Sequence, residues 1–166
     1  MSHAPWIWPD PPFEIVLHEP CIPPNTGNVA RTCAATGTPL HLIEPLGFEI
    51  SDRQLKRAGL DYWPHVRLTV HPDWETFAAD RDPGRFHLFS IHGRRPLHDV
   101  RFRPGDVLVF GSETSGLPKP LLEAHADRTV CLPMRDEAVR SLNLANTVAV
   151  ALFEALRQGQ PGEGGF

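Results

Sequence analysis

The chain alternates between short apolar runs and amphipathic stretches. The apolar runs have the length and composition of buried β-strands and lie at 13–18, 40–43, 66–70, 86–91, 107–110 and 129–132. The amphipathic stretches have helical spacing and lie at 25–37, 52–58, 73–79, 118–125 and 142–157. Because strands alternate with helices, the pattern predicts an α/β fold with a mostly parallel sheet flanked by helices.

Polar and glycine residues set the expected ends of these helices. Asn25 or Thr26 is expected to cap the first helix, and Gly37 follows its last turn. Asp73 is expected to cap the helix that runs to about residue 79.

The last helix begins beside an unusual polar cluster. It is expected to start at Leu142, with Ser141 and Asn143 at or just inside its N-terminus. Its apolar face follows helical spacing through Leu142, Ala145, Ala149, Leu152, Phe153 and Leu156. An ordinary N-cap would explain Ser141 and Asn143, but a helix end with free N–H groups also binds polar ligands.

The length of 166 residues fits one domain, which we place at residues 13–158. Residues 1–12 are rich in proline and are expected to form an irregular N-terminal extension. Residues 159–166 are rich in glycine and are expected to form a disordered tail. The chain has no long apolar run and no signal-peptide pattern, so we expect a cytoplasmic protein that does not enter the membrane.

Cysteine spacing and charge exclude further classes of protein. The three cysteines, Cys21, Cys33 and Cys131, match no zinc pattern, and we expect them to be reduced and mostly buried. His, Cys and carboxylate residues form no set with metal-ligand spacing, so no metal is expected. The net charge of −4 argues against indiscriminate coating of nucleic acid, although a local basic face stays possible.

In a parallel sheet, ligands bind beyond the carboxyl ends of the strands, and the loops there are unusual in this chain. The first loop, 19–28, is stiffened by prolines and leads into a helix that carries Arg31. The last loop leads from Cys131 to the polar cluster at Ser141 and Asn143. These loops are expected to form one site.

The middle loop, 110–118, has the glycine spacing of a P-loop at Gly111 and Gly116. Leu117 and Pro118 replace the Lys-Ser/Thr pair that binds phosphate, and Glu113 adds a carboxylate. The chain also lacks the GxGxxG pattern of dinucleotide-binding folds, which disfavours another nucleotide-dependent enzyme. The loop suits a neutral or cationic ligand with hydroxyl and amino groups, such as a nucleoside with a sulfonium.

Together the three loops resemble the ordered motifs of the SPOUT superfamily of RNA methyltransferases, in its TrmH-like ribose 2'-O-methylating branch. The motifs are Asn25-x-Gly27-Asn28-x-x-Arg31, Gly111-x-Glu113-x-x-Gly116-Leu117 and Pro133-Met134 followed by Ser141-Leu142-Asn143. The chain is most similar to the small single-domain members that methylate the wobble nucleotide of tRNA, cytidine or uridine 34. The stretch 133–141 is one residue longer than is common in that group, and Phe153 stands where some members have Tyr.

The resemblance implies a C-terminal trefoil knot, a homodimer and S-adenosyl-L-methionine as cofactor. The positions that match the cofactor site are Phe89, Gly111, Glu113, Gly116, Leu132, Met134 and Ser141. The positions that match the catalytic cluster are Asn25, Arg31, Glu113, Ser141 and Asn143.

The resemblance also implies a reaction, methyl transfer to the ribose 2'-hydroxyl of the tRNA wobble nucleotide. We expect Arg31 to stabilise the developing alkoxide and orient a phosphate, with Glu113 and Asn25 holding its side chain. The expected partner is the anticodon loop, bound across the dimer surface. Alternatives are ribose methylation of rRNA or of another tRNA position, and a knotted RNA-binding protein without activity.

Overall fold

The computed structural model describes residues 6–50, 62–135 and 139–160. A seven-stranded sheet has the strand order β3-β2-β1-β6-β4-β7-β5, and every neighbouring pair is parallel. The strands are β1 (Glu14–His18), β2 (Leu40–Ile43), β3 (Leu68–His71), β4 (Phe86–Phe89), β5 (Arg95–Pro96), β6 (Val107–Phe110) and β7 (Thr129–Cys131). The predicted parallel α/β fold is confirmed.

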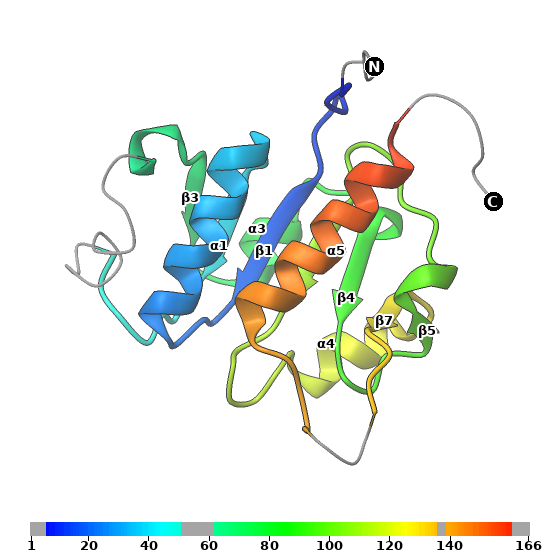
Figure 1. Ribbon diagram of the computed structural model, residues 1–166. Helices are drawn as coiled ribbons and strands as arrows, with labels where there is room; N and C mark the ends of the chain where they lie inside the picture. Colours follow the sequence, from blue (N-terminus) through cyan, green and yellow to red (C-terminus); the bar gives the residue numbers. More distant parts are fainter. Residues whose placement is uncertain (1–5, 51–61, 136–138, 161–166) are drawn as a thin grey trace.

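Helices cover both faces of this sheet. They are α1 (Pro23–Thr36), α3 (Trp74–Ala78), α4 (Lys119–Ala124) and α5 (Leu144–Gln158), with single 3₁₀ turns at Trp63–His65, Pro83–Arg85, Leu97–Asp99 and Ala126–Arg128. Helices α1 and α5 lie side by side over one face (Figure 1) and bury Val29 and Leu152 against Ile15 of β1. On the other face, Phe77 of α3 packs with Val16 of β1. Alternate residues of β1 thus enter opposite cores, as the strand period requires.

Helix α1 begins earlier than the sequence predicts. Its N-cap is Ile22, and prolines occupy the first turn, where their missing N–H groups cost nothing. Asn25 and Thr26, the expected caps, lie inside the helix and are buried. The predicted end is correct, because Gly37 adopts the left-handed conformation with a φ of 67°.

Helix α5 begins two residues later than expected. Asn143 is the N-cap, and its side-chain oxygen accepts hydrogen bonds from the backbone N–H groups of Ala145 and Asn146. Leu142 therefore precedes the helix and is exposed, and Phe153 is also exposed. The buried face consists instead of Ala145, Val148, Ala151, Leu152, Ala155 and Leu156.

The other boundaries differ little from the prediction. Asp73 caps α3 by accepting a hydrogen bond from the backbone of Thr76, as expected. Strand β3 starts at Leu68, two residues later than expected, after a 3₁₀ turn that ends at His65. The helix expected at 52–58 lies outside the described residues.

The first and last described segments contact each other beyond the C-terminus of α5. Residues 6–12 form neither helix nor strand, and Trp6 and Trp8 are exposed. The side chain of Gln160 exchanges two hydrogen bonds with the backbone of Ile7, at 3.0 and 2.7 Å. Residues 161–166, most of the expected disordered tail, lie outside the described residues. No described helix has the length and apolar character needed to span a membrane.

Only one of the three free cysteines is buried. The side chain of Cys33 lies in the core beneath α1, and burial raises the pKa of its thiol to about 12. Cys21 and Cys131 are partly exposed, contrary to the expectation that the cysteines are mostly buried.

Candidate active site

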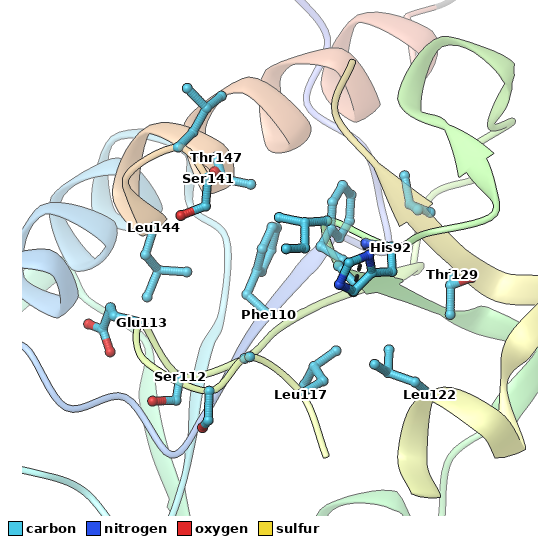
Figure 2. Close-up of a pocket in the computed structure, with 18 of the residues that line it drawn as sticks. His92, Phe110, Ser112, Glu113, Leu117, Leu122, Thr129, Ser141, Leu144 and Thr147 are labelled. Carbon is cyan, nitrogen blue, oxygen red and sulfur yellow. Dashed lines mark hydrogen bonds between the residues drawn. The ribbon is translucent and has the colours of Figure 1, made fainter. Parts of the chain in front are cut away.

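The loops that follow β4, β6 and β7 enclose a pocket of about 850 Å³, together with the segment that leads into α5. Parallel strands end at the same edge of a sheet, so loops far apart in sequence meet there. Figure 2 shows Glu113 and Ser141 at one end of this pocket and Leu122 and Thr129 at the other.

The loop after β6 is tightly closed on itself. Gly116 has a φ of 69° and donates its backbone N–H to Ser112 O at 2.9 Å. A Cβ atom on Gly111 would lie 2.1 Å from the carbonyl carbon of Gly116, so only glycine fits there. This closure fixes Glu113, which lies between the two glycines.

The Glu113 carboxylate joins this loop to the start of α1. It accepts hydrogen bonds from the backbone N–H of Cys21 at 2.8 Å and of Ile22 at 3.2 Å. It also accepts one from the side-chain amide of Asn25 at 3.2 Å. Burial alone would raise the pKa of Glu113, but these donors and the Cys21 thiol outweigh burial and lower the pKa. Glu113 is therefore ionised at neutral pH.

Asn25 continues the network to the last loop. Its side-chain oxygen accepts a hydrogen bond of 2.9 Å from the side-chain amide of Asn143, which also caps α5. Glu113, Asn25 and Asn143 thus form a chain of hydrogen bonds that joins all three motifs. The sequence predicts these residues for the site, and the fold brings them together.

Arg31 lies apart from this network. Its guanidinium lies 5.6 Å from the centre of the Tyr62 ring, and it forms no hydrogen bond within the described residues. The Tyr62 hydroxyl donates to Gly27 O, which fixes the ring on α1. The expectation that Glu113 and Asn25 hold Arg31 is wrong for this structure, because backbone donors occupy Glu113 and Asn143 occupies Asn25.

The residues predicted to bind the cofactor all line the pocket: Phe89, Gly111, Glu113, Gly116, Leu132, Met134 and Ser141. Ser141 lies before the N-cap of α5 rather than inside the helix, and its hydroxyl forms no hydrogen bond within the described residues. Phe89 stacks on Phe110 with ring centres 4.5 Å apart, and both rings line the pocket.

The far end of the pocket has both apolar and polar lining residues, and the sequence analysis missed several of them. Leu117, Leu122 and Val130 line it, together with the Thr129 side chain. Apolar residues such as Leu122 and Val130 look in the sequence like ordinary core residues, so nothing there indicates that they line a pocket. The backbone N–H groups of Cys21 and Ile22 were also missed. The prolines after them gave a signal, because they place the start of the helix directly after these two residues.

The pocket therefore has an ionised, hydrogen-bonded end and a second end where Leu117, Leu122 and Val130 supply apolar surface beside polar side chains such as Thr129. Such a pocket suits an amphipathic ligand that carries a positive charge at one end. In the described part of the chain, no three His, Cys, Asp or Glu side chains gather in a way that could hold a metal ion.

A parallel α/β sheet with a pocket built from its last loops defines the class of α/β enzymes that bind a nucleoside-like ligand at the sheet edge. Within this class, the sequence profile of the SpoU rRNA Methylase family matches residues 12–153. The chain belongs to this family.

Known proteins of this family are close in sequence and in structure. The tRNA (cytidine(34)-2'-O)-methyltransferase of Burkholderia pseudomallei (strain 1106a) is 54% identical over 149 residues, which are 88% of this chain and 95% of the relative. A solved structure described as "Structural insights into the 2-OH methylation of C/U34 on tRNA" is 52% identical, with a TM-score of 0.83 over 88% of this chain and 95% of its own.

A more distant structure contains a ligand. The SpoU methyltransferase AviRb from Streptomyces viridochromogenes, in complex with the cofactor AdoMet, is 25% identical and has a TM-score of 0.76. The match covers 89% of this chain and 58% of AviRb. These matches place the fold in the knotted SPOUT class, as the resemblance of the three motifs implied.

Proposed function

We propose that this protein transfers a methyl group from S-adenosyl-L-methionine to the ribose 2'-hydroxyl of the wobble nucleotide of tRNA. The observation that carries the proposal is the hydrogen-bonded chain of Glu113, Asn25 and Asn143 at one end of the pocket. It joins the three motifs of the family at one point. The relatives that match over nearly their whole length supply the substrate, since they act on nucleotide 34.

The pocket fits S-adenosyl-L-methionine in shape and charge. The apolar side chains of Leu117 and Leu122 would contact the adenine base, and the backbone of the loop from Gly111 to Gly116 would contact the ribose. The ionised Glu113 at the other end favours a ligand with a positive charge. When bound, the cofactor would supply an electrophilic methyl group on a sulfonium.

The residues at the ionised end would position the RNA ribose. Asn25 and Asn143 hold each other, so the loop that carries Ser141 is fixed beside the first helix. The Ser141 hydroxyl, which forms no hydrogen bond within the described residues, is available to the ribose. The 2'-oxygen would form a bond to the methyl carbon as the carbon–sulfur bond of the sulfonium breaks, which leaves a neutral thioether, and the hydroxyl proton would pass to solvent. Correct orientation of the two partners supplies much of the acceleration in such a displacement.

Arg31 would act on the RNA rather than on the network. It is exposed on the helix that carries Asn25, and its planar guanidinium suits a phosphate next to the target ribose. There it would also stabilise the negative charge that develops on the 2'-oxygen. A guanidinium is a poor base, and this role requires no proton transfer to Arg31.

The proposal includes a cytoplasmic homodimer that binds the anticodon loop across both subunits. The outer face of α5 supports it, because Val150 is 48% exposed and Phe153 is 52% exposed. We expect a dimer in size-exclusion chromatography with light scattering, and Phe153→Glu should shift it toward the monomer. A wild-type monomer at all concentrations would exclude the dimer.

Transfer of labelled methyl to tRNA that lacks the modification, followed by nuclease mapping, tests the reaction. We expect label on the wobble ribose and a loss of about 100-fold in rate for Arg31→Ala. Arg67→Ala is the matched control, because Arg67 is an exposed arginine that contacts Gly37 O beyond the end of α1. Label at another tRNA position or on rRNA would reject the substrate. Cofactor binding without transfer to any RNA would favour the non-catalytic alternative.

A further inference from the structure

Two large aliphatic side chains lie exposed beside the polar network. Ile22 is 41% exposed and Leu142 is 42% exposed, and both line the pocket. Ile22 is three residues before Asn25, and Leu142 directly precedes Asn143. Each of the two segments joined by the hydrogen bond between Asn25 and Asn143 therefore also carries an exposed aliphatic side chain.

Both aliphatic residues belong to backbone that the network holds in place. The N–H of Ile22 donates to Glu113, and Ile22 is also the N-cap of α1. Leu142 is tied through Asn143, which caps α5 and bonds to Asn25. The two side chains are thus presented by fixed segments, which is the condition for a precise contact with a ligand.

Their position decides what they can contact. A ribose whose 2'-hydroxyl reaches this end of the pocket carries its base on the adjacent carbon, C1'. The base must then lie beside the residues that border the reacting end. The carboxylate and the two amides there are already engaged, since Asn25 and Asn143 bond to each other and Glu113 binds backbone N–H groups, and the Ser141 hydroxyl is assigned to the ribose. What the border offers the base is aliphatic surface.

We propose that Ile22 and Leu142 form an aliphatic clamp that contacts the faces of the pyrimidine base whose ribose is methylated. This inference rests on the proposed function and names a contact of its substrate. Cytosine and uracil differ in the hydrogen-bonding groups along their edges, but both present an apolar ring face. A clamp made of aliphatic carbon contacts both bases alike, so it positions the nucleotide without distinguishing cytidine from uridine.

The test compares Ile22→Ala and Leu142→Ala with the wild type on tRNA transcripts that differ only in C or U at the wobble position. Loss of aliphatic contact should raise the KM for RNA about tenfold for each variant, by the same factor on both transcripts. Ile22→Val and Leu142→Met keep the aliphatic surface and should restore the KM to within about twofold. The affinity for S-adenosyl-L-methionine, measured by calorimetry without RNA, should not change.

Ile7→Ala is the matched control. Ile7 is 51% exposed and bonds to Gln160 beyond the far end of α5, away from the pocket. It should behave as the wild type in KM, cofactor affinity and oligomeric state.

Other outcomes overturn the clamp in ways that identify the actual occupant. If the alanine variants lose the dimer, Ile22 and Leu142 contact a second copy of the chain. If they lose cofactor affinity, they contact the cofactor. An unchanged KM removes them from the RNA site, as does an effect confined to one of the two transcripts. If the wild type transfers no methyl group to the wobble ribose, the proposed function fails and the clamp fails with it. That result is distinct from a failure of the variants alone.

Discussion

Glu113 and Glu14 are carboxylates at different parts of the same sheet, and different partners hold them. Glu113, in a loop, accepts hydrogen bonds from backbone N–H groups and from Asn25, and no cationic side chain contacts it in the described part of the chain. Glu14, on β1, lies 2.8 Å from a ring nitrogen of His41 and 2.7 Å from the guanidinium of Arg81.

The difference decides where the negative charge is available. Arg81 neutralises Glu14 directly and also lies 4.2 Å from the centre of the Phe77 ring, so the network is closed between the strands and α3. His41 bonds further to His71 of β3, with ring nitrogens 3.0 Å apart. Glu113 is held by neutral donors, so its charge stays available to the pocket. The first kind of network holds strands together, and the second can orient a ligand.

The largest effect should come from breaking the Glu113 network. Glu113→Ala frees the start of α1 from the loop after β6, and misplacement of Asn25 and Asn143 should lower the rate of methyl transfer about 100-fold. Single-turnover transfer at saturating RNA measures it. A rate near that of the wild type would show that the loops keep their positions without the carboxylate.

Breaking the Glu14 network should affect stability and leave catalysis unchanged. Glu14→Gln leaves Arg81 and His41 without a charged acceptor and should lower the free energy of unfolding by about 2 kcal/mol. Urea unfolding measures this, with Asp80→Asn as the control at an exposed carboxylate. A loss of transfer rate in folded Glu14→Gln would contradict the separation of the two networks.

Two helix caps offer a narrower comparison. Asn143 caps α5 and also bonds to Asn25, whereas Asp73 only caps α3. Asn143→Ala and Asp73→Ala should each cost about 1 kcal/mol of stability. The rate of transfer should fall about tenfold in Asn143→Ala alone, since only this cap is linked to the site. Equal rates in the two variants would mean that Asn143 acts only as a cap.

Acidification should produce the smallest effect and should act first on the network around Glu14. Burial lowers the pKa of His71, and the nearby His41 and Arg81 add to this effect, so the fold favours its neutral form. The unfolded chain therefore binds more protons, and stability should fall as the pH drops below about 6.5. His71→Asn should flatten this dependence in urea titrations. If the stability of His71→Asn depended more steeply on pH than that of the wild type, the pKa of His71 would be raised by folding rather than lowered.

The network around Glu113 should withstand that acidification. It contains no histidine, and hydrogen bonds lower the pKa of Glu113, so its stabilising effect is lost only as the pH falls below about 4.3. Amide exchange checks this, because the protection factor of Ile22 should be the same at pH 7 and pH 5.5. Loss of that protection at pH 5.5 would show that the two networks titrate together.

Local patterns in the sequence predicted most of the elements and the composition of the site. The apolar runs at 40–43 and 107–110 became strands with the predicted bounds, because both faces of these strands are buried. Gly37 and Asp73 ended and began their helices as expected, since caps depend on a few neighbouring residues. The residues predicted for the cofactor site all border one pocket, because loops after parallel strands meet at one edge.

Helix starts were harder to predict where several candidates follow one another. Asn25 has the chemistry of a cap, yet it lies inside α1 and bonds to Glu113, because the prolines before it already form the first turn. Phe153 fits the helical period of α5 but is exposed, because the buried face of the helix runs through Val148, Leu152 and Leu156 instead. Spacing fixes a period but not which side of it faces the core.

The sequence by itself thus determined the order of strands and helices, the three motifs and the family to which the chain belongs. Only the tertiary structure decided the partners of each polar group. It paired Glu113 with the backbone N–H groups of Cys21 and Ile22, and it left Arg31 over Tyr62, outside the pocket. The reason is that hydrogen bonds depend on distances of about 3 Å between atoms that are far apart along the chain. Those distances exist only once the sheet has aligned its loops.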